Sequence, residues 1–211
     1  MGKVVVITNV SLDGVMQSPG RPDEDMRDSF EHGGWAVRFA AMQQAEAGEA
    51  FANMGALLFG RRTYEDFYAV WPQRTDSPFS AFLNNIPKYV ASTTLEEPLS
   101  WSNSTLLKDD AMEAVSRLKE EESKDLVVFG SGVLVQSLVR CDLVDDFVLL
   151  IHPLILGSGR RLFSHHGVFT TLTLRDCKTT TNGVVVATYQ LANNRNTAYQ
   201  PVAAAGAVRR H

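Results

Sequence analysis

Cysteine is scarce in this sequence, which has only two, Cys141 and Cys177, far apart along the chain. A fold held by disulfides needs more cysteines, and a structural zinc site needs ligands in closely spaced pairs. The sequence also lacks an apolar run long enough to cross a bilayer, and it begins with the strand-like segment KVVVITNV instead of a signal peptide. We therefore expect a reduced, cytoplasmic protein that has no metal site and does not bind within a membrane.

An excess of charge of one sign is also missing. Lys and Arg total 20 against 24 Asp and Glu, which gives a net charge of −4, and no basic block stands out. Binding to nucleic acid or to an anionic membrane surface relies on such a block, so we expect neither partner. The remaining composition, with 45% hydrophobic and 21% charged residues, is ordinary for a globular domain with one sizeable core.

The chain shows neither internal repeats nor an inter-domain linker. We expect a single domain over residues 1–191. Residues 192–211 are polar and then rich in Ala and Gly without periodicity, which predicts a loosely ordered tail or a packing arm.

Strand-like and helix-like segments alternate up to about residue 150. Apolar and β-branched runs predict strands at 3–10, 55–60, 88–93, 104–108, 125–130 and 145–156. Apolar residues at helical spacing predict helices at 35–54, 63–71 and 132–140, and another that starts at Asp110. Segments 168–179 and 183–191 alternate like an antiparallel pair joined at Asn182-Gly183. This order predicts a three-layer α/β/α domain whose mixed, mostly parallel sheet ends in an antiparallel hairpin.

Glycines, arginines and hydroxyl side chains follow three of these strands, at 60–63, 92–94 and 130–133. Ligands of such sheets bind at the carboxyl ends of the strands. Amides at a helix start, a threonine hydroxyl and a guanidinium together can hold a phosphate, and arginine suits a 2′-phosphate. A glycine turn that only lets a helix pack closely, with arginines as surface charges, is the alternative. A standard Rossmann site is disfavoured, because Val135 stands where its fingerprint has Gly or Ala.

Five segments resemble the dihydrofolate-reductase-like superfamily in their order and context, most closely the reductase domain of the bifunctional deaminase/reductase of riboflavin biosynthesis. They are NVSLDGVM (9–16), LLFGRRTYE (57–65), YVASTT (89–94), VVFGSGVLVQSLV (127–139) and LVDDFVLLIHPLILGSGRRLF (143–163). The resemblance runs from about residue 3 to residue 190 and does not include the upstream deaminase domain. It implies a mixed sheet of about eight strands, NADPH as hydride donor, and a homodimer.

Carried over residue by residue, the resemblance implies four cofactor-binding segments. The adenosine 2′-phosphate side would be held by Gly60, Arg61, Arg62 and Thr63, and the second adenosine-side segment would be Ser92, Thr93 and Thr94. The loop under the pyrophosphate would be Gly130, Ser131, Gly132, Val133 and Leu134, and the mobile loop over the nicotinamide would be Leu12, Asp13 and Gly14.

Hydride transfer also needs a group that supplies a proton, since the cofactor itself carries only the hydride. Three carboxylates are candidates: Asp13 in the covering loop, and Glu46 and Glu49, which continue the helical stripe that starts at Trp35. Surface charges or an ordinary Asp-Gly turn are the alternatives. His152 lies in a buried run, and we expect a core histidine there rather than a base.

Phe129 stands where the riboflavin-pathway reductases carry a glutamate that contacts the pyrimidine. The leading hypothesis is an NADPH-dependent reductase of a small heterocyclic substrate, similar to the 5-amino-6-(5-phosphoribosylamino)uracil reductase of riboflavin biosynthesis. A reductase of a pterin or another heteroaromatic compound outside that pathway is the alternative that Phe129 favours. A non-catalytic, dimeric NADPH-binding module is the third hypothesis.

Overall fold

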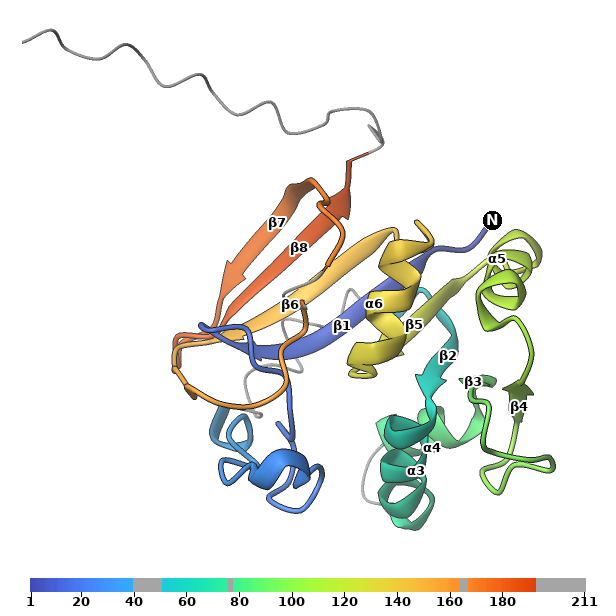
Figure 1. The fold of residues 1–211 in the computed structure, drawn as a ribbon, viewed down its shortest axis with the longest axis horizontal. Helices are drawn as coiled ribbons and strands as arrows, with labels where there is room; N and C mark the ends of the chain where they lie inside the picture. Colours follow the sequence, from blue (N-terminus) through green and yellow to red (C-terminus); the bar gives the residue numbers. More distant parts are fainter. Residues whose placement is uncertain (40–50, 76–77, 164–166, 193–211) are drawn as a thin grey trace, which may run out of the picture.

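An eight-stranded sheet crosses the computed structural model, which describes residues 1–39, 51–75, 78–163 and 167–192 (Figure 1). The strands are β1 Val4–Ser11, β2 Met54–Gly60, β3 Lys88–Ala91, β4 Ser104–Leu107, β5 Asp125–Phe129, β6 Asp146–His152, β7 Leu172–Thr179 and β8 Val185–Leu191. Their order across the sheet is β4-β3-β2-β5-β1-β6-β8-β7. Pairs from β4 to β6 are parallel, whereas β8 is antiparallel to β6 and β7. The mixed, mostly parallel sheet with a final antiparallel hairpin is confirmed.

Four α-helices are described, α3 Arg61–Val70, α4 Pro78–Asn85, α5 Ala111–Glu121 and α6 Gly132–Arg140, with short 3-10 turns at Arg27–Ser29, Val37–Phe39 and Trp71–Gln73. The predicted start of α5 is confirmed, because the Asp110 carboxylate accepts hydrogen bonds from the amides of Met112 and Glu113 at 3.1 and 3.0 Å. None of the helices in the described part of the chain is long and apolar enough to cross a membrane.

Two predicted boundaries are wrong, and one helix is missing from the prediction. The helix expected at 35–54 cannot reach its predicted end, because β2 already begins at Met54, and residues 40–50 lie outside the described part. The strand expected over 145–156 stops at His152, where Pro153 follows and has no amide hydrogen for a further ladder bond. Helix α4 was not predicted at all.

The two faces of the sheet carry separate apolar clusters, which makes the domain three-layered. Val5 and Ile7 of β1 pack in a cluster with Tyr64 of α3 and Leu83 of α4. The alternate residues of the same strand pack in a second cluster that includes Val115 of α5 and Leu134, Val135 and Leu138 of α6. Central strands that are buried on both faces are expected to be apolar, as Leu126–Phe129 of β5 are.

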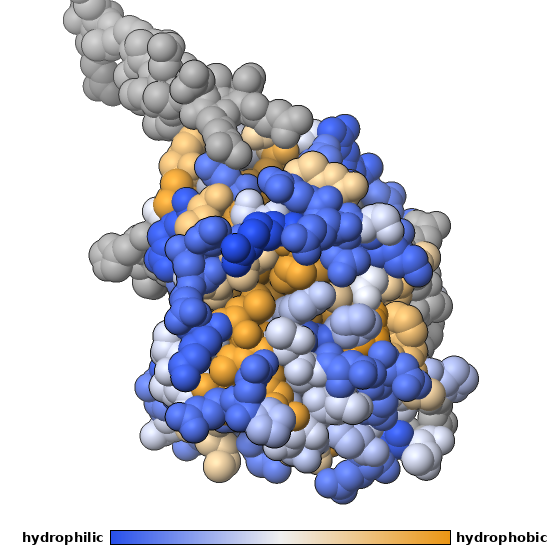
Figure 2. Space-filling view, turned by 90° about the vertical axis from the view of Figure 1, so that its right-hand side faces the viewer, coloured by the Kyte–Doolittle hydropathy of each residue, from blue (hydrophilic) through white to orange (hydrophobic). Residues whose placement is uncertain are grey.

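The second cluster is incompletely covered beside α5. On the side of the molecule that carries α5 and β4, apolar side chains show in a hollow that hydrophilic residues surround (Figure 2). The elements of this side contribute Tyr89, Ala91, Leu107 and Met112, which are only partly buried. Ala91 and Leu107 are the last residues of β3 and β4, so apolar surface reaches the carboxyl edge of the sheet.

A third, smaller cluster lies beyond the ends of β1 and β6. Val15, Phe30, Trp35 and Ala36 are buried in it, and Leu154 and Leu156 pack against it. It gives the long segment after β1 a small apolar core of its own.

Candidate functional site

The four predicted cofactor segments lie along one edge of the sheet. Strands β3, β2, β5 and β1 are neighbours in that order and are parallel, so their carboxyl ends point the same way (Figure 1). Gly60 pairs with Ala91, which puts the residues that follow β2 and β3 side by side. Strand β1 runs on to Ser11, beyond Ile7, the partner of Phe129, so Leu12–Gly14 lie further out than the turn after β5. The structure therefore brings the first three segments together and places the covering loop beyond them.

Two hydroxyl groups join the segments that follow β2 and β5. The Gly60 amide donates to Ser131 Oγ at 3.0 Å, and the Ser131 amide donates to Thr63 Oγ1 at 3.2 Å. Gly130 and Ser131 have φ angles of 55° and 49°, in the left-handed region that a serine rarely adopts. The hydroxyls of Ser131 and Thr63 thus already shape the turn, and any ligand would meet mainly backbone amides.

Helices α3 and α6 begin directly at these two segments. Neither has an acidic residue in its first turn, so nothing offsets the positive end of either helix dipole. Free amides at such helix starts are suited to bind an anion.

The two predicted arginines are not equivalent. Arg61 pairs with Glu65 one turn further along α3, at 3.1 Å. Arg62 is exposed, and no carboxylate of the described residues forms an ion pair with it. In the third segment, Ser92 Oγ accepts from the amides of Thr94 and Leu95, both at 3.1 Å, while Thr93 and Thr94 are exposed. Arg62 and the two threonines are the side chains that an incoming ligand could reach.

The predicted covering loop is a tight turn closed by the Gly14 amide, which donates to the Ser11 carbonyl at 2.9 Å. Asp13 Oδ1 accepts from the Ser11 hydroxyl at 2.6 Å and the Leu156 amide at 3.1 Å, and its Oδ2 accepts from the Gly157 amide at 3.0 Å. Burial is the largest single influence on the pKa of Asp13 and raises it, but these hydrogen bonds together outweigh burial and hold the pKa below its usual range. An ionised carboxylate has no proton to donate, so the geometry favours a positioning role for Asp13.

Two contacts bring the segment after β1 over the end of β5. A Cβ at Gly132 would lie 2.7 Å from Met16 Sδ, so Met16 sits directly against the glycine turn. Arg21 forms an ion pair with Asp66 of α3. This ion pair fixes the loop after β1 to the helix that follows β2.

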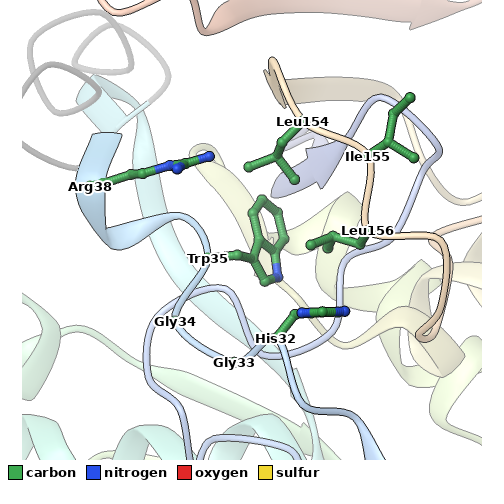
Figure 3. A pocket seen from close by; sticks show the side chains of 8 residues that line it. All are labelled: His32, Gly33, Gly34, Trp35, Arg38, Leu154, Ile155 and Leu156. Carbon is green, nitrogen blue, oxygen red and sulfur yellow. The ribbon is translucent and has the colours of Figure 1, made fainter.

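A cavity of about 340 Å³ opens on the other side of the covering loop (Figure 3). Its lining residues are His32, Gly33, Gly34, Trp35, Arg38, Leu154, Ile155 and Leu156. The Leu154 carbonyl accepts from the Leu12 amide at 2.9 Å, so cavity and covering loop share a wall. The sequence does not reveal this cavity, although Trp35 and Leu154 lie in a predicted helix and a predicted strand.

His152 lies behind Trp35 as a fully buried core histidine, as expected. Its Nε2 is 2.9 Å from Asn9 Oδ1, and its ring packs edge-on against Trp35 and Phe39 at 5.0 Å. Burial, and then the charge of Arg38, lower the pKa of His152 to about 4, which leaves the ring neutral near pH 7.

Glu46 and Glu49, the other two candidate proton donors, lie outside the described residues. Phe129 packs against Phe51 and Phe67, with 6.0 Å between ring centroids in both cases. An aromatic cluster therefore occupies the position where the riboflavin-pathway reductases place a carboxylate.

Residues 2–186 match the RibD C-terminal domain family. The chain belongs to this family. An uncharacterized protein of Bacillus subtilis (strain 168), YyaP, is 28% identical over 141 residues, which are 65% of this chain and 74% of YyaP.

Solved structures share the fold of this RibD C-terminal domain protein at low identity. A putative riboflavin biosynthesis protein from Shewanella sp. PV-4 gives a TM-score of 0.62 at 20% identity, over 90% of this chain and 99% of the other. Dihydrofolate reductase from Enterococcus faecalis, complexed with NADP(H), gives 0.52 at 14% identity, over 90% and 96%. The dihydrofolate-reductase-like fold and the resemblance seen in the sequence are confirmed.

Proposed function

We propose that this protein is an NADPH-dependent oxidoreductase that reduces a small heterocyclic compound. The observation that carries the proposal is the convergence of Gly60–Thr63, Ser92–Thr94 and Gly130–Gly132 on one sheet edge, beside a cavity that shares a wall with Leu12–Gly14. Membership of the RibD C-terminal domain family supports it.

The sheet edge fits a phosphorylated dinucleotide. Two helix starts without acidic residues suit its pyrophosphate, and Arg62 suits a 2′-phosphate because its guanidinium is always charged and unpaired among the described residues. The partly exposed Ala91 and Leu107, next to Ser92–Thr94, offer apolar surface to an adenine ring.

Bound NADPH would supply the hydride, and the residues of this chain would position the two reactants and keep water away. Trp35, Leu154 and Leu156 give the cavity apolar walls against which a ring can lie. Asp13 would fix the covering loop to the cavity wall through the Leu156 and Gly157 amides. For the proton donor, Glu46 and Glu49 remain predictions.

The aromatic surroundings of Phe129 favour a substrate outside the riboflavin pathway over the pyrimidine ribityl phosphate. A reductase of a pterin or another heteroaromatic compound is therefore our second candidate. A homodimer and a cytoplasmic location remain predictions that come from the family resemblance and the composition.

Thermal unfolding with NADPH, with NADH and without ligand tests the proposal. A ligand that binds only the folded state at 100 times its Kd adds about 2.7 kcal/mol of stability. We expect NADPH to raise the Tm, and Arg62→Ala to reduce that shift while leaving any NADH shift unchanged. Arg117→Ala, on the exposed face of α5, serves as the charge-matched control. Folded protein without a shift for either cofactor would contradict the proposal, and binding without turnover of any heterocycle would support the non-catalytic module.

A further inference from the structure

We propose that the cavity beside the covering loop binds a small planar aromatic or heteroaromatic acid, with its ring against Leu154, Leu156 and the exposed part of Trp35, and its anionic group on Arg38. That this acid is the substrate rests on the proposed function, whereas its binding does not. The cavity volume of about 340 Å³ suits a ligand of one or two rings.

The ring-binding part of the cavity has one rigid wall. Trp35 is 8% exposed, so only a small part of its indole reaches the cavity, and its indole N–H donates to the Gln17 carbonyl at 2.7 Å. The edge contact with His152 fixes the tilt of the indole. Leu154 and Leu156 lie beside the indole on the opposite segment (Figure 3). A fixed aromatic side chain with aliphatic neighbours favours planar rings over flexible or bulky groups.

The charge of the lining selects an acid. Arg38 and His32 lie at two ends of the cavity, on either side of Trp35, and none of the described lining residues is acidic (Figure 3). The Arg38 guanidinium rests on the Phe39 ring at 4.8 Å, and no carboxylate of the described residues forms an ion pair with it.

Other arginines of these loops, unlike Arg38, form ion pairs with carboxylates. Arg27, Arg160 and Arg161 pair with Asp25, Asp28 and Asp13. Among the described arginines of these loops, Arg38 is thus available to hold a ligand carboxylate, and its planar fork matches both oxygens of such a group.

Two matched ligands test the inference: quinoline-2-carboxylate and the uncharged quinoline-2-carboxamide. The affinity of each is measured by calorimetry on the full chain, with and without NADPH. We expect the acid to bind at least tenfold more tightly than the amide. Arg38→Gln should abolish that preference and leave the affinity for the amide unchanged, and Arg38→Lys should keep part of it. Arg140→Gln, at the exposed end of α6, should behave as the unaltered protein.

Arg38 is exposed, so its replacement does not endanger folding. Equal affinities for acid and amide, a preference that survives in Arg38→Gln, or no binding of either compound at millimolar concentration would each overturn the inference. Binding of the acid in a protein that fails to bind NADPH would support the inference and sink the reductase proposal. Binding of NADPH without any preference for the acid would overturn the inference and leave the reductase proposal standing.

Discussion

The sheet edge and the cavity both contact the loop after β1, but they are built in different ways. At the edge, every predicted residue lies within a few positions of a strand end, and hydroxyl–amide bonds such as Thr63 to Ser131 hold the segments together. The cavity lies just beyond the end of β6. Its walls come from two loops that a small apolar cluster around Trp35 and Phe30 holds in place. The edge therefore depends on sheet topology, and the cavity depends on packing.

The cavity side should be the more sensitive to a single methyl group. Gly159 has a φ of 112°, and a Cβ there would lie 2.7 Å from both Phe30 and Val15. We expect Gly159→Ala to lower the free energy of unfolding by about 2–5 kcal/mol, from left-handed backbone strain and overpacking. Gly157 has a φ of 77° with open space around it, so Gly157→Ala should lower the free energy of unfolding by only about 1 kcal/mol. Urea unfolding measures both, and equal losses would show that packing around Gly159 is not what matters.

Acid should also lower the stability of the protein through His152, which lies behind the cavity. The pKa of His152 falls from 6.5 to about 4 on folding, chiefly through burial. Between these values the unfolded chain binds a proton that the folded protein does not, so stability falls as the pH falls from 6.5 to 4. We expect a loss of about 2–3 kcal/mol, measured by urea unfolding across that range.

The control for this pH dependence is the comparison of two histidine variants. His152→Gln should flatten the profile, whatever its stability at pH 7, because the buried ring no longer resists protonation. His32→Gln, at an exposed histidine, should leave the slope intact. A slope that persists in His152→Gln would assign the acid sensitivity to carboxylates.

The edge should respond more weakly to the loss of one hydroxyl. Thr63→Val keeps the shape of the side chain but removes the oxygen that accepts from the Ser131 amide. We expect a loss of about 1–2 kcal/mol of unfolding free energy, together with weaker NADPH binding because the glycine turn is no longer fixed. Thr94→Val, at an exposed threonine, should change stability by less than about 0.5 kcal/mol. Equal effects of the two variants would mean that Thr63 does not hold the turn.

The smallest effect should come from the ion pair that links the two regions. Arg21→Ala removes the partner of Asp66, and we expect a loss of about 0.5–1 kcal/mol with faster amide hydrogen exchange in residues 18–25. Arg61→Ala breaks only an exposed pair within α3 and should cost about 0.3–0.5 kcal/mol, without a change of exchange in that loop. Unchanged exchange in Arg21→Ala would show that other contacts hold the loop.

The sheet and its edge could be predicted because their signals are local. β-Branched runs mark the strands, Asp110 marks a helix start, and parallel strand ends bring short motifs together. Helix α4 could not be found this way, because its sequence PFSAFLNN has little intrinsic helix preference. Tertiary contacts stabilise it instead: Leu83 is fully buried, and the buried Lys88 ammonium donates to the carbonyls of Asn84 and Ile86 near its end.

Within the candidate site, residue types could be predicted, but not the bonds between them. The sequence does not reveal that Arg61 is paired while Arg62 is not, or that Ser131 and Thr63 bond each other's segments. The cavity was missed for a related reason. Trp35 and Leu154 are far apart in the sequence, and only the folded arrangement of both loops brings them together.

The ion pair between Arg21 and Asp66 has a consequence for how the protein responds to ionic strength. It fixes the loop after β1 to helix α3, which follows β2. Added salt screens partly exposed charges, so ionic strength would set how firmly this loop is held against the helix.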